Sequence, residues 1–323
     1  MLKTPIFWYK EKSILGLLLS PIGWLYNAIS QFRHQLSTPS TSDIPVLCIG
    51  NLTIGGSGKT PVAISLCEIL KAHGKVPHFV SRGYGGTYKE VLLQVDPSIH
   101  PPGLVGDEPF LLASHAPTWV TQSRTKAIAA AQDAGADIVI LDDGFQNPSV
   151  TKDFSIVVID GPNGFGNGHV FPAGPLREKI VDGLRRANIA VVLGKGSPLK
   201  NKSIPIISAE IKPKNHQLNG KKVVAFAGIG IPKKFFTTLE NEGAIIVREI
   251  AFPDHHTYTQ KDEKYLLAEA KTQETILVTT QKDFVKLSPS FKKKVTFLEI
   301  YIDWENEQSL ITHLESLLNG KKT

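Results

Sequence analysis

The chain has 323 residues, of which 41% are hydrophobic and 20% are charged; this is the balance of a globular protein with one large or two modest domains. Its two cysteines, Cys48 and Cys67, exclude a disulfide framework, and we expect both to be packed, reduced thiols of a cytosolic protein. The net charge of +6 favours anionic partners, but basic residues are scattered and no nucleic-acid-binding motif is present, so we expect phosphorylated ligands or acidic lipid and no nucleic acid.

The first predicted element is a helix in the N-terminal segment, residues 1–40. Residues 13–30, SILGLLLSPIGWLYNAIS, carry no charge and are flanked by basic residues. This length approaches that of a membrane span, but Gly16, Pro21 and Gly23 interrupt the run and no signal-peptide cleavage pattern is present. Two interpretations remain open: a helix lying in the membrane interface with its aromatic residues at headgroup depth, or a helix packed on the core of the protein.

From Ile44 onward, short apolar runs alternate with helical patterns, which predicts an α/β/α sandwich for residues 41–200. Near-continuous runs of Val, Ile and Leu are typical of parallel strands that are covered on both faces. The predicted strands are IPVLCIG (44–50), VPHFVS (76–81), TWVTQ (118–122), DIVILDD (137–143), FSIVVID (154–160) and NIAVVLG (188–194), with helices over 61–73 and 125–135.

The first strand leads into a glycine-rich turn, GNLTIGGSGKTP, and then into a predicted helix. Glycines let backbone N–H groups surround a phosphate, and the helix N-terminus adds partial positive charge. Thr53 stands where the full phosphate-loop pattern has glycine, yet the remaining pattern still predicts a P-loop NTPase-like nucleotide site. The residues expected to bind the phosphates of the nucleotide are Thr53, Gly55, Gly56, Ser57, Gly58, Lys59 and Thr60, and the Thr60 hydroxyl is also available to Mg²⁺.

Acidic residues occur at two further places in this domain. Asp142 and Asp143 end the strand DIVILDD, and carboxylates at the end of a strand beside a phosphate loop hold Mg²⁺ directly or through water. Asp107 and Glu108, in GDEP, begin a predicted helix that they could simply cap.

Arginines follow three strand or loop ends, in SRGYGG, SR and PLRE. These are Arg82, Arg124 and Arg177, and together at one sheet edge they suit binding of phosphate or of developing transition-state charge.

A segment rich in Lys, Pro and Asn, residues 201–220, is the predicted linker to a smaller α/β domain, residues 221–323. Its predicted strands are KKVVAFAGIG, AIIVREIAF, TILVTT and VTFLEIYI, and its helices are PKKFFTTLENEG and NEQSLITHLESLLNG. The motif FPDHH follows the second of these strands and places Asp254, His255 and His256 at the sheet edge where ligands bind. A histidine paired with a carboxylate can accept a proton or hold another acid in its working state, but which histidine does so is left open.

Taken together, these motifs resemble one family, the tetraacyldisaccharide 4'-kinases of lipid A biosynthesis. The matching segments, spread over most of the chain, are PIGWLYNAISQFR, GNLTIGGSGKTP, SRGYGG, GDEPFLLA, LDDGFQN, GNGHVFPAGPLRE, FAGIGIPKKFF and FPDHHTY. The phosphate loop of the family also lacks the early glycine, so Thr53 is no departure. Gln281, in TTQKD, does depart from the glutamate that is usual in the family.

The resemblance implies that ATP, with Mg²⁺, phosphorylates the 4'-hydroxyl of a tetraacylated glucosamine disaccharide 1-phosphate, forming lipid IVA. It places the protein at the cytoplasmic face of the inner membrane of a Gram-negative bacterium, with the N-terminal helix as the membrane-docking element. It makes Asp107 the general base and His255 its partner. The other implied roles are metal support by Asp142, Asp143 and Glu108, and substrate or charge stabilisation by Arg82, Arg124, Arg177 and Glu178.

From the residues and the resemblance together, we expect the second domain to close so that FPDHH lies over GDEP. One rival is a membrane-associated P-loop GTPase or ATPase switch, because TTQKD loosely fits a guanine-reading pattern. The other rival is a non-catalytic peripheral membrane protein that uses nucleotide only as a conformational ligand.

Overall fold

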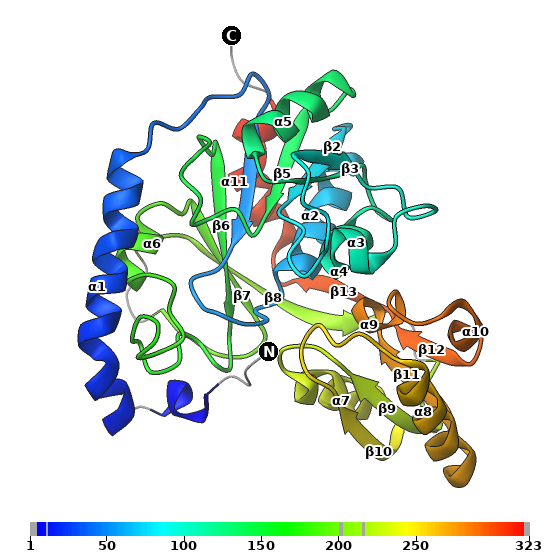
Figure 1. The fold of residues 1–323 in the computed structure, drawn as a ribbon. Coiled ribbons are helices and arrows are strands. Elements are labelled where there is room, and N and C mark those ends of the chain that lie inside the picture. Colours follow the sequence, from blue (N-terminus) through cyan, green and yellow to red (C-terminus); the bar gives the residue numbers. More distant parts are fainter. Residues whose placement is uncertain (1–4, 11, 200–202, 215–216, 320–323) are drawn as a thin grey trace.

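Buried strands and helices alternate along the chain, as the sequence predicts, and they build two α/β units (Figure 1). The computed structural model describes residues 5–10, 12–199, 203–214 and 217–319. Within these residues, nine strands form the sheet of the larger unit and four form the sheet of the smaller unit. Cys48 and Cys67 are buried free thiols, which confirms their predicted state.

The sheet of the larger unit has the strand order β13-β8-β7-β6-β1-β5-β2-β4-β3. From β8 to β4 the strands run parallel, and β13 and β3 pair antiparallel at the two edges. The strands are β1 (Val46–Gly50), β2 (Pro77–Ser81), β3 (Leu92–Gln94), β4 (Thr118–Thr121), β5 (Ile138–Asp142), β6 (Phe154–Asp160), β7 (Ile189–Leu193), β8 (Ile206–Pro213) and β13 (Ile300–Trp304).

Helices cover both faces of this sheet, because alternate residues of each strand point to opposite sides. On one face, α2 (Lys59–Ala72) and α11 (Glu307–Leu318) share a hydrophobic cluster with Leu47 of β1. On the other face, α5 (Arg124–Asp133) and α6 (Ile180–Leu184) share a second cluster with Cys48 of β1. The short helices α3 (Pro102–Val105) and α4 (Asp107–Leu112) follow the edge strand β3. This arrangement confirms the predicted α/β/α sandwich.

The smaller unit contains a parallel sheet of order β10-β9-β11-β12 between two further hydrophobic clusters. Phe235 and Leu239 of α7 pack on one face, and Leu266 of α8 packs on the other. The strands are β9 (Lys222–Ala227), β10 (Ile245–Ala251), β11 (Ile276–Thr280) and β12 (Val295–Leu298); the helices are α7 (Pro232–Asn241), α8 (Gln260–Gln273), α9 (Gln281–Phe284) and α10 (Pro289–Lys292).

The structure differs from the predicted domain boundaries at two places. Part of the predicted linker forms β8, whose side chains are only alternately buried, so it lacks the continuous apolar run of the central strands. The predicted strand VTFLEIYI is two strands, since β12 ends the small sheet and β13 returns to the edge of the large one. The C-terminal helix α11 consequently belongs to the larger unit, where Leu310 and Leu314 are fully buried.

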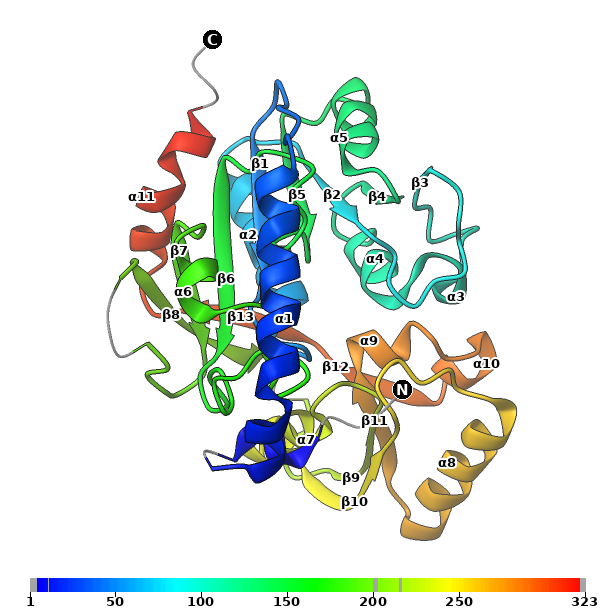
Figure 2. The ribbon, with the colours of Figure 1, turned by 60° about the vertical axis from the view of Figure 1, so that its left-hand side comes forward.

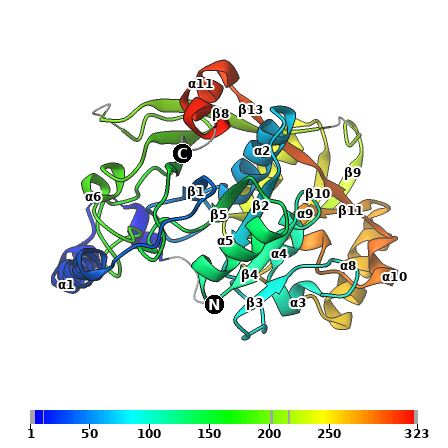
Figure 3. The same ribbon diagram turned by 90° about the horizontal axis from the view of Figure 1, so that it is seen from above.

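The N-terminal helix α1 (Ile14–Leu36) lies along the outside of the larger unit, after a short 3₁₀ helix, η1 (Ile6–Tyr9) (Figure 2). It stands beside α6 and away from the sheet (Figure 3). The predicted helix is present and continues through Pro21, and Gly23 allows close packing: a Cβ there would lie 2.7 Å from the carbonyl oxygen of Val170. Among the described residues, no helix combines the length and apolar character needed to cross a membrane.

Candidate active site

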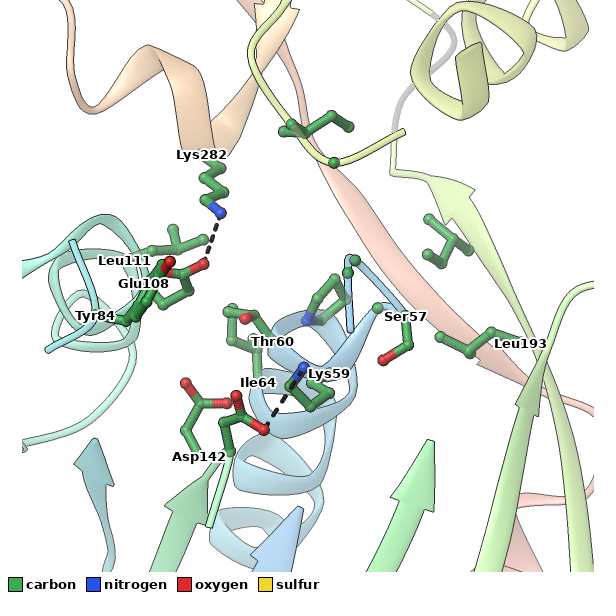
Figure 4. Close-up of a pocket in the computed structure, with 18 of the residues that line it drawn as sticks. Ser57, Lys59, Thr60, Ile64, Tyr84, Glu108, Leu111, Asp142, Leu193 and Lys282 are labelled. Atoms are coloured by element: carbon green, nitrogen blue, oxygen red, sulfur yellow. Dashed lines mark hydrogen bonds and ion pairs between the residues drawn. The ribbon is translucent and has the colours of Figure 1, made fainter. Parts of the chain in front are cut away.

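The predicted site residues gather where the parallel strands of the larger unit end and the smaller unit faces them. A cleft of about 1890 Å³ opens there, lined by the phosphate loop, α4, the strand end of β5 and loops of the smaller unit. Figure 4 shows Lys59, Thr60 and Asp142 on the side of the larger unit, with Lys282 reaching in from the opposite wall.

The phosphate loop has the backbone conformation that its glycines predict. Gly55 and Gly58 have positive φ angles of 119° and 86°, and Gly58 is the N-cap of α2. A Cβ on Gly58 would lie 2.4 Å from Cδ1 of Leu193, so a larger residue would displace that side chain and would be strained at this positive φ. The hydroxyl of Ser57 is buried and has no hydrogen-bond partner among the described residues. Thr53 lies at the base of the loop, where it forms an isolated β-bridge.

Asp143 links the loop lysine to an arginine from a distant segment. Arg177 donates two hydrogen bonds to the Asp143 carboxylate, at 2.9 and 3.2 Å, and the Lys59 ammonium lies 3.8 Å away. Burial opposes ionisation of Asp143, but Lys59 and Arg177 outweigh it and hold the pKa of this carboxyl below its ordinary value. Asp143 also has a left-handed backbone, with φ 51°, which turns its side chain toward these cations.

Asp142 lies in a different environment from its neighbour. Burial, together with the nearby charges of Asp143 and Glu108, raises the pKa of Asp142 to about 7. Its buried Oδ1 has no hydrogen-bond partner among the described residues. A buried carboxylate oxygen without a protein partner is suited to a cation bound with the nucleotide.

One contact between the two units joins Asp107 of α4 to His255 of the loop after β10. Nδ1 of His255 lies 3.1 Å from Oδ2 of Asp107, and the Tyr84 ring packs edge-on against the imidazole. His255 has a left-handed backbone, with φ 56°, so its side chain points away from that of the next residue. His256 instead contacts Asp262 at 3.2 Å. The structure thus identifies His255 as the partner of Asp107.

The ionisation of Asp107 follows from its neighbours. Burial raises the pKa of Asp107, but the hydrogen bond from His255 and the charges of Lys286 and Lys282 together lower it below its ordinary value. The Lys286 ammonium lies 3.5 Å from the same carboxylate oxygen that His255 contacts. Asp107 is therefore held as a carboxylate.

Lys282, in TTQKD, also belongs to this site, although it was not among the predicted site residues. Its ammonium lies 2.6 Å from Oε1 of Glu108 and 3.3 Å from Nε2 of His255. Burial lowers the pKa of Lys282, but Glu108 and Asp254 raise it above its ordinary value overall. Glu108, a predicted metal ligand, is thus ion-paired across the cleft. The sequence signal was a lysine two residues after a strand end.

Within TTQKD, Thr280 and Gln281 also line the cleft, whereas Asp283 is internal to the smaller unit. Asp283 is fully buried, and its carboxylate accepts hydrogen bonds from the Gly228 N–H at 2.9 Å and the Thr280 hydroxyl at 2.7 Å. Such a carboxylate is not available to a base in the cleft. The guanine-reading interpretation of this segment therefore lacks structural support.

The predicted arginines occupy different positions around the site. Arg82, Arg124 and Arg177 all line the cleft. Arg124 is buried and lies 3.4 Å from the carbonyl oxygen of Asp143, whereas Arg82 is exposed. Glu178 is only 1% exposed, and it contacts Gln146 at 3.2 Å behind the cleft wall.

Comparisons with a family model, with sequence relatives and with a solved structure point to the same protein family. A family model described as tetraacyldisaccharide-1-P 4'-kinase matches residues 15–319. Two relatives named tetraacyldisaccharide 4'-kinase are 42% identical, from Rhodospirillum centenum, and 44% identical, from Paramagnetospirillum magneticum; the alignments cover 99% and 97% of this chain and 98% of each relative. The fold is similar to a crystal structure of LpxK from Aquifex aeolicus in complex with ATP, with a TM-score of 0.77 and 27% identity over 94% of this chain and all of that one.

Proposed function

Because the chain belongs to the tetraacyldisaccharide-1-P 4'-kinase family, we propose that it transfers the γ-phosphate of ATP to the 4'-hydroxyl of a tetraacylated glucosamine disaccharide 1-phosphate. The product would be lipid IVA, a precursor of lipid A. The observation that supports this proposal is the Asp107–His255 contact, which joins α4 to the smaller unit next to a cleft that the phosphate loop, Glu108 and His255 line.

ATP would bind with its phosphates against the N–H groups of Gly55 to Gly58 and the N-terminus of α2. Lys59 and Arg177 would neutralise phosphate charge, with the buried Arg124 and the exposed Arg82 at the rim. The resemblance to a structure in complex with ATP supports this nucleotide.

The residues present fit Mg²⁺ bound together with ATP. The described residues contain no cluster of three or more His, Cys, Asp or Glu side chains that could hold a metal without other ligands. Mg²⁺ does not need such a cluster, because it is commonly bound by one or two carboxylates plus phosphate oxygens and water. Asp142, with its unpartnered oxygen, and the Thr60 hydroxyl would hold it, whereas Asp143 and Glu108 are already ion-paired. When bound, Mg²⁺ supplies neutralisation of the phosphate charge.

In the proposed reaction, Asp107 takes the proton of the 4'-hydroxyl while the acceptor oxygen bonds to the γ-phosphorus and ADP leaves. Phosphoryl transfer passes through a loose transition state, so positioning contributes more than the strength of the base. A carboxylate with a lowered pKa can therefore suffice if His255 orients it. Lys282 and Lys286 offset the negative charges of Glu108 and Asp107, which would otherwise repel the phosphates.

The acceptor is a lipid, and α1 is the surface suited to meet it. The helix buries its small and polar residues, Gly16, Ser20, Gly23 and Asn27, against the protein. Its large apolar side chains face outward and are exposed: Ile14, Leu15, Leu17, Leu18, Ile22, Trp24, Leu25, Tyr26, Ile29, Phe32 and Leu36. We infer that this face lies in the cytoplasmic surface of the inner membrane, which brings the cleft to the lipid headgroup.

The proposal is tested by transfer of ³²P from γ-labelled ATP to a detergent-solubilised acylated glucosamine disaccharide 1-phosphate. We expect labelled lipid with the wild type and little with Asp107→Ala. Hydrolysis of ATP without labelled lipid would instead favour a nucleotide switch. Unchanged labelling with Asp107→Ala would contradict the role of this carboxylate. Preference for GTP over ATP would also contradict the proposal.

A further inference from the structure

A series of polar contacts joins α1 to the phosphate site, and Arg186, just after α6, lies in the middle of it. Its Nη1 lies 3.1 Å from Nε2 and 3.3 Å from Nδ1 of His34 in α1. Its Nη2 bonds to Oε2 of Glu178, and its guanidinium stacks 4.8 Å from the centroid of the Phe145 ring. The planar guanidinium thus contacts the helix, a buried acid and the loop after β5 at once.

The series continues from Glu178 to the loop lysine. Oε1 of Glu178 accepts a hydrogen bond from Nε2 of Gln146 at 3.2 Å. Oε1 of Gln146 accepts one from Nη1 of Arg177, also at 3.2 Å. Arg177 in turn holds Asp143 in two hydrogen bonds, and Asp143 lies 3.8 Å from Lys59.

The orientation of the Gln146 amide is the critical step in this series. Its Nε2 faces two acceptors, the Glu178 carboxylate and the carbonyl oxygen of Asn51, at 3.2 and 2.8 Å. Its Oε1 is consequently the atom that faces Arg177 and can accept from it. If the amide turned over, an N–H group would meet the guanidinium, and Arg177 would lose a partner.

Arg186 contributes to this orientation because it holds Glu178, one of the two acceptors that Nε2 of Gln146 faces. Glu178 is only 1% exposed, with Oε2 bonded to the guanidinium and Oε1 facing Gln146, so loss of Arg186 removes the ion-pair partner that holds this buried carboxylate in place. On the other side, burial and the nearby cations lower the pKa of His34 to about 4, so its neutral ring can accept a hydrogen bond from Arg186. The other charged groups near this histidine are Lys152 and Arg33.

We propose that Arg186 is a positioning residue for phosphoryl transfer: it ties the docked helix α1 to the orientation of the Gln146 side chain, and so holds Arg177 and Asp143 beside Lys59. Arg186 itself does not line the cleft. The expected loss of rate rests on the proposed function, whereas the positioning of Gln146, Arg177 and Asp143 does not. A displacement of a positioned group by about 1 Å can cost about a hundredfold in rate.

The test compares Arg186→Met, which keeps an apolar stem but removes the guanidinium, with Arg185→Met, which removes an equal charge from an exposed neighbour. In the ³²P-transfer assay, we expect kcat to fall about tenfold or more in Arg186→Met, with a smaller change in the KM for ATP. We expect Arg185→Met to retain the wild-type rate. Arg186→Lys, which restores the charge without the planar fork, should recover part of the loss.

A double variant separates positioning from stability. Arg186→Met leaves the Glu178 charge buried and unpaired, which lowers the thermal midpoint, and adding Glu178→Gln removes that charge. We expect the thermal midpoint of the double variant, Arg186→Met with Glu178→Gln, to return toward the wild-type value. Its kcat should stay low, close to the lower of the kcat values of the two single variants. A kcat that recovers with the midpoint would overturn the proposal, as would two rate losses that simply multiply.

Hydrogen exchange tests the same contact without an acceptor. We expect the backbone amides of residues 144–147 to exchange faster in Arg186→Met than in Arg185→Met and the wild type. Equal exchange in all three proteins would overturn the proposal even if the wild type proved to phosphorylate a different acceptor. Absence of labelled lipid with the wild type, together with the expected exchange, would instead count against the proposed function alone.

Discussion

Asp142 and Asp143 are adjacent in the chain, yet their surroundings push ionisation in opposite directions. Asp143 faces Lys59 and Arg177, which stabilise its carboxylate. Asp142 is buried next to that carboxylate and has a pKa raised to about 7. Ionised Asp142 therefore destabilises the metal-free protein, a cost that functional sites commonly carry.

We expect Asp142→Asn to raise the thermal midpoint of the metal-free protein by about 5 °C at pH 8 and to abolish turnover. The ordinary pKa of the carboxyl is 3.8, so the unfolded state ionises first as pH rises and native stability falls up to about pH 7. The increase in thermal midpoint that Asp142→Asn causes should thus be largest at pH 8 and should vanish near pH 4.

The neighbouring Asp143→Asn is the matched control, and differential scanning calorimetry across this pH range is the measurement. Because Asp143 stabilises through its ion pairs, its removal should lower the midpoint, by a modest amount since the side chain is more than a third exposed. A fall in both variants, or a gain for Asp142→Asn that does not depend on pH, would contradict these assignments.

Some parts of the candidate site could be predicted from local sequence, and others could not. The phosphate loop and Asp142 follow from local sequence, because a strand, a glycine turn and a helix are contiguous. The pairing of Asp107 with His255 joins segments far apart in the chain, and sequence reasoning reached it through a family resemblance. The choice of His255 over His256 depends on a left-handed backbone angle that the sequence does not reveal.

At the scale of elements, α1 differs from an ordinary surface helix, because it exposes its large apolar side chains and buries its small and polar ones. Its buried side is small and polar, with hydrogen bonds such as the one from the Lys179 N–H to Oδ1 of Asn27 at 3.0 Å. The spacing of Gly16, Ser20, Gly23 and Asn27 follows one helical face, and this spacing was the available sequence signal. The count of uncharged residues alone could not distinguish the two faces.

We expect Leu18→Gln combined with Leu25→Gln to weaken binding to vesicles of phosphatidylethanolamine and phosphatidylglycerol by more than about tenfold. Both side chains are exposed on α1, and burial of each leucine in an apolar medium contributes about 1.5–3 kcal/mol. Vesicle flotation measures the binding. Unaltered thermal stability would show that the fold is retained.

The matched control for this variant is Val91→Gln combined with Ile99→Gln, since both of these apolar side chains are exposed outside α1. We expect it to float with vesicles as the wild type does. Equal flotation of the α1 variant and the wild type would contradict membrane docking through this helix.

At the scale of the whole molecule, the chain leaves the larger unit, builds the smaller one and returns. The predicted linker differs from the structure because β8, next to the edge strand β13, shows only alternating burial, and the antiparallel pairing of β8 with β13 joins segments far apart in the sequence. The smaller unit is thus an insertion held at both ends by the large sheet. This arrangement places His255 and Lys282 of the smaller unit against Asp107 and Glu108 of α4.

We expect Leu314→Ala to lower the free energy of unfolding of the larger unit by about 3 kcal/mol, although it lies close to the C-terminus. Leu314 is fully buried in the cluster that also contains residues of β1 and α2, and truncation leaves a cavity there. Urea denaturation measures the loss. The exposed neighbour Glu315 supplies the control, because Glu315→Ala should have little effect, and a Leu314→Ala protein of wild-type stability would contradict the return of α11 to the larger unit.

The central claim is that the smaller unit contributes His255 to orient Asp107 for phosphoryl transfer. The most direct measurement is kcat, with the ATP dissociation constant, for His255→Asn beside the matched variant His256→Asn. We predict that His255→Asn lowers kcat about a hundredfold while ATP affinity stays close to that of the wild type, and that His256→Asn retains most activity. Equal losses of kcat and ATP affinity in His255→Asn, or an equal loss of kcat in both variants, would contradict the account.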